Sequence, residues 1–192
     1  MKKTLFQYIY YKINVLLDKV LTLRERFERT EKADRGIYRK FIDKYDPSIE
    51  LQETDILCCY DLIQTKGGDR QLIEIKTRWD YRYADFEDIS VDERKIKCIM
   101  KSVSDNESAY LCAIFPRDEK IVLIDITGIT YTEDDLVRRY ANAQTISDNP
   151  YKRVKTFVPL SLRKGKDKKL NTKTFVYHYP NLSEEYTAIY KL

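Results

Sequence analysis

Three charged residues interrupt the apolar stretches of the segment YDLIQTKGGDRQLIEIKTR, residues 60–78. Side chains two positions apart in a strand share a face, so Glu74 and Lys76 point the same way. A two-residue turn at the Gly-Gly pair places Asp61 directly opposite Glu74, where two carboxylates repel each other. A divalent cation relieves that repulsion, and Mg²⁺ favours one or two carboxylates together with water and phosphate oxygens. Lys76 then lies beside the cation, where it can polarise an attacking water and stabilise phosphate charge. The spacing therefore predicts a site for phosphodiester hydrolysis.

The apolar pattern around this segment predicts elements in the order helix, strands, helix, strands, which is typical of a single α/β or α+β domain. Ser90 and Glu93 have the spacing of a capping box at the start of the second helix, and Thr132 is a candidate cap for a third. A three-residue turn in place of the two-residue turn would shift the register of the hairpin. The predicted helices span residues 4–45, 91–104 and 132–144, and the predicted strands span residues 49–52, 55–65, 70–77, 109–115, 120–127 and 174–179.

An Asp on one strand followed by Glu-x-Lys on the next resembles the PD-(D/E)xK, or restriction-endonuclease-like, nuclease superfamily. The matching residues are Asp61 and the triplet EIK at 74–76, although Tyr60 stands where the family pattern has proline. The resemblance implies an αβββαβ core with a central mixed sheet flanked by helices. Residues of about 20–127 fit this order, leaving an N-terminal helical extension and a C-terminal basic extension, 128–192. We expect all 192 residues to form one nuclease-like domain.

The resemblance also implies a bound Mg²⁺ or Mn²⁺ and a third acidic residue on the first helix. Glu31 and Asp34 are our candidates, because they lie on an otherwise apolar stripe of that helix. The alternative is that both are boundary positions on a solvated helix. Glu53 and Asp55, just ahead of the Asp61 strand, are weaker alternatives.

Several basic residues near the triplet are candidates for contact with nucleic acid. Enzymes of this superfamily often carry a basic residue on the second helix, near the scissile phosphate. Lys95 is the candidate for that role, with Arg94 and Lys97 as competitors. The connection after the triplet interleaves Arg78 and Arg82 with aromatic residues, which suits phosphate contacts and base stacking. The alternative for this connection is a loop anchored to the core by its tryptophan.

The charge is distributed unevenly along the chain. Residues 152–173 contain nine Lys or Arg and one acid, whereas residues 43–74 contain eight acids and three bases. A basic segment beside an acidic centre is typical of an enzyme that binds a polyanion and holds a cation. The alternative is a solvated basic loop. Within the basic segment, the candidates for DNA contact are Lys164, Lys166, Lys168 and Lys169.

Other features of the sequence narrow the chemistry. The chain has one histidine, His178, which argues against a nucleophile activated by histidine. The four cysteines lack the spacing of a zinc site and are expected to be buried, reduced thiols of a cytoplasmic protein. The N-terminal apolar run is broken by polar residues and reads as an amphipathic helix rather than a signal peptide or membrane span. We expect a cytoplasmic location, in the host cytoplasm if a phage encodes the chain.

Two classes of function follow. The first is a metal-dependent DNA endonuclease or exonuclease in which Asp61 and Glu74 bind Mg²⁺ and Lys76 assists the water. The second is a catalytically inactive protein of the same fold, a nucleic-acid-binding or assembly subunit from a phage or mobile element. Retention of Asp61, Glu74 and Lys76 favours the first. The expected partner is DNA, with a homodimer as a possible assembly and no membrane.

Overall fold

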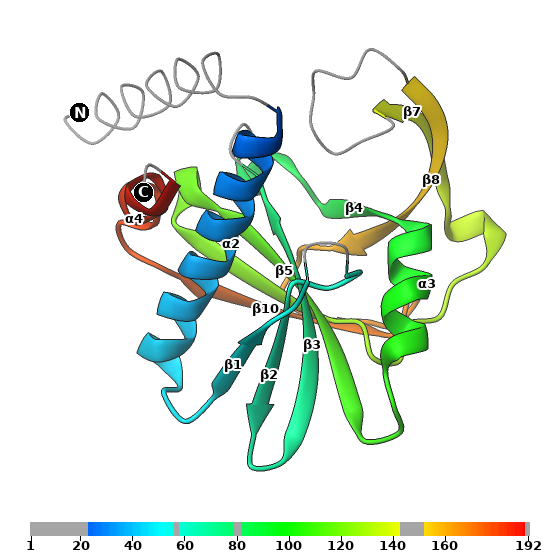
Figure 1. Ribbon diagram of the computed structural model, residues 1–192. Coiled ribbons are helices and arrows are strands. Elements are labelled where there is room, and N and C mark those ends of the chain that lie inside the picture. Colours follow the sequence, from blue (N-terminus) through cyan, green and yellow to red (C-terminus); the bar gives the residue numbers. More distant parts are fainter. Residues whose placement is uncertain (1–22, 56–57, 79–81, 143–151, 191–192) are drawn as a thin grey trace.

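The computed structural model describes residues 23–55, 58–78, 82–142 and 152–190, and shows two β-sheets with three helices (Figure 1). The larger sheet has seven strands in the order β1-β2-β3-β5-β6-β10-β9, and the smaller has three in the order β4-β8-β7. The elements are α2 (Leu23–Tyr45), β1 (Glu50–Glu53), β2 (Leu62–Lys66), β3 (Asp69–Thr77), β4 (Asp88–Asp92), α3 (Glu93–Ser102), β5 (Glu107–Phe115), β6 (Lys120–Asp125), β7 (Val137–Asn142), β8 (Lys152–Ser161), β9 (Gly165–Asp167), β10 (Thr172–His178) and α4 (Leu182–Tyr190).

The expected fold class is confirmed as a mixed α/β architecture with a central mixed sheet. β3 and β5 pair in parallel, whereas the other neighbours in the large sheet are antiparallel. A parallel pair needs a crossover connection, and here that connection contains α3. The order α2, β1, β2, β3, α3, β5 is the expected αβββαβ order, with β4 inserted ahead of α3.

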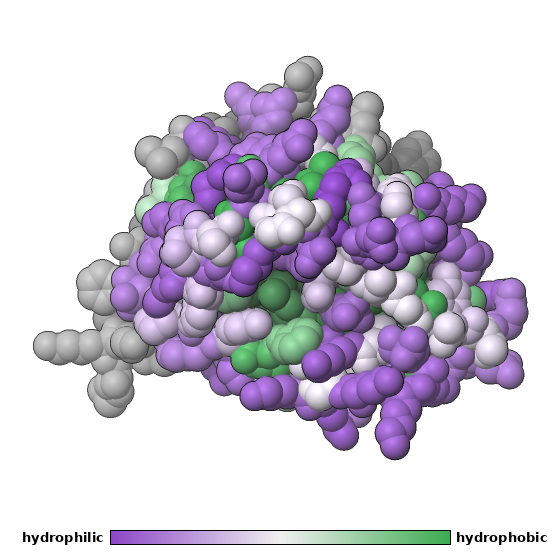
Figure 2. All heavy atoms as spheres, turned by 90° about the horizontal axis from the view of Figure 1, so that it is seen from below, coloured by the Kyte–Doolittle hydropathy of each residue, from purple (hydrophilic) through white to green (hydrophobic). Residues whose placement is uncertain are grey.

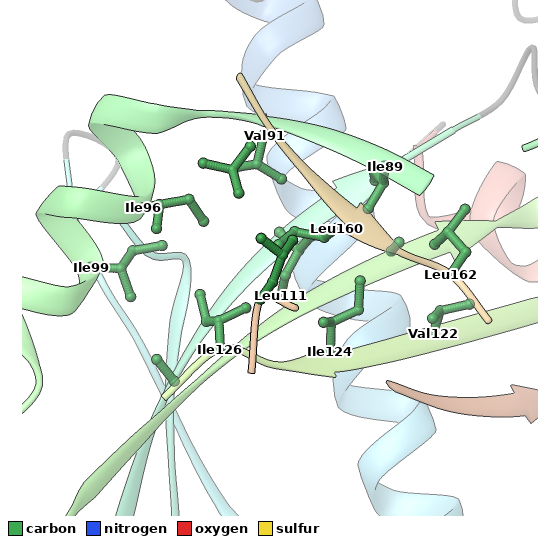
Figure 3. Close-up of a cluster of buried hydrophobic side chains, with 14 of the residues drawn as sticks. Ile89, Val91, Ile96, Ile99, Leu111, Val122, Ile124, Ile126, Leu160 and Leu162 are labelled. Carbon is green, nitrogen blue, oxygen red and sulfur yellow. The ribbon is translucent and has the colours of Figure 1, made fainter. Parts of the chain in front are cut away.

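The large sheet separates two apolar cores. On one face, α2 and α4 cover the sheet through buried side chains such as Ile37 and Tyr186, which pack with Ile73 and Ile75 of β3. On the other face, α3 and the small sheet cover a second cluster. Figure 3 shows side chains of α3, β4 and β8 directed toward those of β5 and β6 in this cluster. Because strand side chains alternate between faces, β3 contributes to both cores.

The β2–β3 hairpin has the predicted register. Lys66 pairs with Asp69, and the ladder continues in step to the pair Leu62 and Ile73. Gly67 and Gly68 form the turn with φ of 58° and 96°. A two-residue turn with positive φ at both positions favours glycine, because a Cβ atom is strained there. The two glycines therefore determine which strand residues face each other.

The predicted start of the second helix is wrong by a few residues. Ser90 lies in β4, and α3 begins at Glu93. Asp92 is the N-cap residue, because its carboxylate accepts a hydrogen bond of 3.0 Å from the backbone N–H of Arg94. The α2 helix confirms the helical prediction for residues 23–45, whereas the part of that prediction before Leu23 lies outside the described residues.

The predicted helix at 132–144 is also wrong. Thr132 and Asp135 do form a capping box, but it closes a single 3₁₀ turn, Glu133–Asp135. The chain then enters β7, which pairs with β8 in the small sheet. A local cap signal says nothing about a strand partner that lies further along the chain, and here pairing with that partner decides the conformation.

Residues beyond 127 pack into both cores of the molecule. Val158 and Leu160 of β8 belong to the cluster beneath α3, and Leu182 of α4 belongs to the cluster beneath α2. β10 lies inside the large sheet next to β6.

Seen from the end of the molecule that carries the β2–β3 turn, hydrophilic side chains cover most of the surface around a small apolar recess (Figure 2). None of the helices among the described residues has the length and hydropathy of a membrane span.

Candidate active site

Glu74 lies in the middle of β3, and its side chain is completely buried. Ile73 and Ile75 on either side point into the core beneath α2, so Glu74 points to the opposite face, toward α3. Leu72, which shares the face of Glu74, packs into the core on that side. A buried carboxylate in an apolar strand requires compensating groups, because burial disfavours the charged form.

Asp61 is fixed beside Glu74 by two hydrogen bonds to the β3 backbone. Its N–H donates to the carbonyl of Ile73 over 2.8 Å, and its Oδ2 accepts from the N–H of Ile75 over 2.6 Å. The regular ladder ends one residue later in the sequence, at Leu62, so Asp61 is attached to β3 by these bonds rather than by a ladder pair. The two bonds span the position of Glu74, and the two carboxylates lie near each other, as the sequence predicts.

Two lysines contact the buried carboxylate. Lys76 of β3 and Lys95 of α3 both form ion pairs with Oε1 of Glu74. Apart from these ion pairs, neither carboxylate oxygen of Glu74 has a hydrogen-bond partner in the described part of the chain. The structure thus brings together the predicted triplet residues and Lys95, the basic residue expected on the second helix. Of the two competitors for that position, Arg94 pairs with Asp92, and Lys97 pairs with Glu93.

The electrostatics of this cluster make Glu74 easier to protonate than an exposed glutamate when no cation is bound. Burial raises the pKa of Glu74 to about 7; Asp61 adds to the rise, and Lys76 and Lys95 oppose it. Burial alone would lower the pKa of Lys76, but the carboxylates of Glu74 and Asp61 outweigh it and hold that pKa above its ordinary value. Lys76 therefore carries its positive charge at neutral pH.

The two candidate carboxylates on α2 have different surroundings. Asp34 is buried and accepts hydrogen bonds from the Thr77 hydroxyl, over 2.6 Å, and from the Tyr186 hydroxyl of α4. Burial raises the pKa of Asp34 to about 6, against these two hydrogen bonds. Glu31 is half-buried, and burial followed by the charges of Asp61 and Asp34 raises its pKa to about 7. Of the two, Glu31 has the weaker attachment to lose on binding a cation, an ion pair of 3.5 Å with Arg35.

The predicted nucleic-acid contacts are spread over the molecule. Arg78 and Lys95 line a groove of about 790 Å³ beside the Glu74 cluster. Arg82 is exposed and precedes a 3₁₀ turn. The candidate lysines of the basic segment are exposed and lie in and around β9, at the far edge of the large sheet. We call them the β9 lysines: Lys164, Lys166, Lys168 and Lys169. β9 is four strands from β3, which corresponds to roughly 19 Å at the usual strand spacing.

Sequence reasoning missed the second wall of the groove. Arg139 of β7 and Lys155 of β8 line it, and both belong to the small sheet. Lys155 lies in the segment recognised as basic, but the sequence does not show that it lines the same groove as Lys76. Tyr186, which holds Asp34, was also missed, because α4 gives no signal of its packing partner. The four cysteines are free, and of them Cys112 is buried as expected. Cys98 is exposed and Cys58 and Cys59 are half-buried, against the expectation of burial.

Within the part of the chain that the structure describes, no three or more His, Cys, Asp or Glu side chains are arranged to hold a metal ion. Mg²⁺ does not need such a group, because it commonly takes one or two carboxylates and completes its shell with water and phosphate oxygens. Asp61 and Glu74 supply oxygen donors of this type, and Oε2 of Glu74 is a buried acceptor without a hydrogen-bond partner. The residues present therefore fit a hard divalent cation.

No protein-family model matches this chain, and no curated protein does. A solved structure with some similarity is that of Hjc, a Holliday junction resolvase from the archaeal hyperthermophile Archaeoglobus fulgidus. The superposition has a TM-score of 0.39 at 14% sequence identity, and it covers 52% of this chain and 78% of that chain.

Proposed function

We propose that this protein is a metal-dependent phosphodiesterase that cleaves DNA. The observation that supports the proposal best is the fully buried Glu74, whose oxygens lack hydrogen-bond partners in the described part of the chain. Two lysines form ion pairs with its Oε1, and Asp61 is fixed beside it. An arrangement that costs folding free energy is typical of functional sites. The resemblance of Asp61 and the 74–76 triplet to the PD-(D/E)xK pattern supports the same class.

In this proposal Asp61 and Glu74 hold a Mg²⁺ or Mn²⁺ ion, and Glu31 is the candidate for a third carboxylate. When bound, the cation neutralises charge on phosphoryl oxygens and activates water. Its charge also stabilises the ionised form of Glu74, which a pKa of about 7 leaves partly protonated at neutral pH in the cation-free protein. Asp34 keeps a structural role in this proposal, because Thr77 and Tyr186 both donate hydrogen bonds to its Oδ1.

The lysines act as fixed positive charges. Because Lys76 is protonated at neutral pH, it cannot remove a proton from water; it can orient that water and donate hydrogen bonds to a phosphate oxygen. Lys95 reaches the same carboxylate from α3 and is placed to contact the same phosphate group. Both ammonium groups are held by Glu74 before substrate arrives, so little reorganisation is needed when the phosphate binds.

A second candidate function has support from one observation. Lys76 and Lys95 already neutralise Glu74 without a cation. The cluster could therefore be a structural ion network in a catalytically inactive protein that binds DNA. This alternative differs from the first in requiring no cation and giving no cleavage.

The experiment that separates the two is a cleavage assay on linear duplex, branched and single-stranded DNA, with Mg²⁺, Mn²⁺ or EDTA. We expect the wild-type protein to cut at least one of these with a divalent cation and none in EDTA. Glu74→Gln should cut none, whereas Glu50→Gln, an exposed carboxylate on β1, should behave as wild type. Failure to cut any substrate, or equal cleavage by Glu74→Gln, would remove the nuclease proposal.

A further inference from the structure

The groove beside Lys76 and Lys95 has walls from both sheets. One wall is the end of β3, and the other is the small sheet β4-β8-β7, which lies beside α3 (Figure 1). Its volume of about 790 Å³ is in the range of sites that hold a small ligand. The small sheet lies outside the αβββαβ order, so this wall is additional to the core that the sequence predicts.

The groove carries an excess of positive charge. Two acids, Asp88 and Asp92, line it together with six cationic side chains. Asp92 is paired with Arg94 over 2.9 Å and lies 3.9 Å from Lys155, so these two cations offset its negative charge. An anionic ligand is therefore favoured. The six cationic residues are Lys76, Arg78, Arg94, Lys95, Arg139 and Lys155.

The wall formed by the small sheet also presents flat surfaces. The guanidinium of Arg139 lies over the ring of Phe157, with 4.6 Å from Cζ to the ring centroid. Phe86, on the connection that leads to β4, lines the same groove and is 41% exposed. Aromatic rings and guanidinium planes are the surfaces on which unpaired bases stack. The groove thus combines partners for phosphate with partners for a base.

We propose that this groove binds an unpaired nucleotide of a DNA strand, next to the phosphate that the Glu74 site attacks. In a duplex the bases stack on one another, and a protein reaches only their edges in the grooves. A base can lie on Arg139 and Phe157 only if it has left the stack. This inference deepens the proposed function, since it names the substrate as DNA with a single-stranded end, flap or branch.

The test is a binding measurement in EDTA, by fluorescence anisotropy, with a short single-stranded oligonucleotide and a blunt duplex of the same sequence. Arg139→Lys keeps the charge but removes the plane, and Phe157→Ala removes the ring. Because loss of stacking on one base costs about 1–3 kcal/mol, each variant should weaken single-strand affinity about 5- to 150-fold. The salt dependence should stay the same for Arg139→Lys, because the positive charge of the side chain is retained.

The matched control is Arg138→Lys. Arg138 is the adjacent residue of β7, its side chain points to the other face of the sheet, and it pairs with Glu133 over 2.9 Å. This control should leave both affinities unchanged. Arg139 is exposed, so its variants do not depend on core packing, whereas Phe157 is half-buried and its variant needs a thermal melt beside it.

Equal single-strand affinity for wild type and Arg139→Lys would overturn the inference, as would an equal loss on the blunt duplex. Because the measurement is made without a divalent cation, it is independent of cleavage. If the protein cuts DNA and these substitutions leave its single-strand affinity unchanged, the proposed nuclease function stands and the proposed nucleotide site in the groove is refuted. If the substitutions weaken binding as predicted but the protein cuts no DNA, the nucleotide site in the groove stands and the nuclease proposal is refuted.

Discussion

Replacing Glu74 with glutamine tests whether its buried carboxylate destabilises the cation-free protein. Glutamine has nearly the same shape and matches the neutral form of glutamate. The ordinary pKa of a glutamate carboxyl is 4.5, and burial raises the pKa of Glu74 to about 7 in the folded protein. The folded state therefore binds more protons than the unfolded state between these values. By linkage, stability falls as pH rises from about 4.5 to about 7, and the loss is complete above that range.

The difference between 4.5 and about 7 corresponds to about 3 kcal/mol of stability. Without divalent cations, Glu74→Gln should thus be more stable than wild type by about 3 kcal/mol at pH 8 and by only about 1 kcal/mol at pH 5. Other groups with raised pKa values, such as Glu31 and Asp34, are present in both proteins, so they largely cancel in the comparison.

The assay is urea unfolding of both proteins at the two pH values in EDTA, with Glu50→Gln as the exposed control. The control should differ from wild type by no more than about 0.5 kcal/mol at either pH. If Glu74→Gln is instead less stable than wild type at pH 8, the ion pairs of Lys76 and Lys95 outweigh the burial of the charge. Glu74 would then be a structural ion-pair partner, and the reasoning that makes it a cation ligand would be refuted.

Three further predictions concern catalysis, DNA binding and stability. Lys76→Ala should abolish cleavage while leaving DNA affinity within a few-fold of wild type, as measured by cleavage and anisotropy on the same substrate; a large loss of affinity would contradict this. Replacing the β9 lysines with alanine should weaken binding to all sequences and lower the slope of log K against log salt by about 0.9 for each lysine that contacts a phosphate; an unchanged slope would show a solvated surface. Tyr186→Phe should lower the free energy of unfolding by about 1–3 kcal/mol at pH 8, because the Asp34 carboxylate loses a buried hydrogen bond, and by less at pH 5. Urea unfolding measures both, and equal losses at the two pH values would exclude a hydrogen bond to the charged carboxylate.

The part of the site that the sequence predicts correctly depends on local rules. Gly67 and Gly68 fix the length of the turn, and turn length together with strand alternation places Asp61 near Glu74 and directs Lys76 to the same side. A charge in the middle of an apolar strand is visible in the sequence itself, because it breaks the pattern that the core requires. These rules need no knowledge of the rest of the chain.

The features that the sequence does not reveal depend on distant partners. The sequence predicts a helix where β7 lies, because the strand partner β8 lies further along the chain. Arg139 and Lys155 reach the groove only through that pairing, and Tyr186 reaches Asp34 across 152 residues of sequence. A strand preference is set by neighbours on the same face and by the partner strand, so local pattern alone does not determine it.

The most direct test of the site is the binding of Mn²⁺ to the protein without DNA, followed by electron paramagnetic resonance of the free ion. We predict that wild type binds Mn²⁺ and that Asp61→Asn and Glu74→Gln both lose this binding. Asp69→Asn, an exposed carboxylate at the β2–β3 turn, is the matched control and should bind as wild type does. If Asp61→Asn and Glu74→Gln bind Mn²⁺ as wild type does, or if wild type binds none, the carboxylates of Asp61 and Glu74 do not form a cation site.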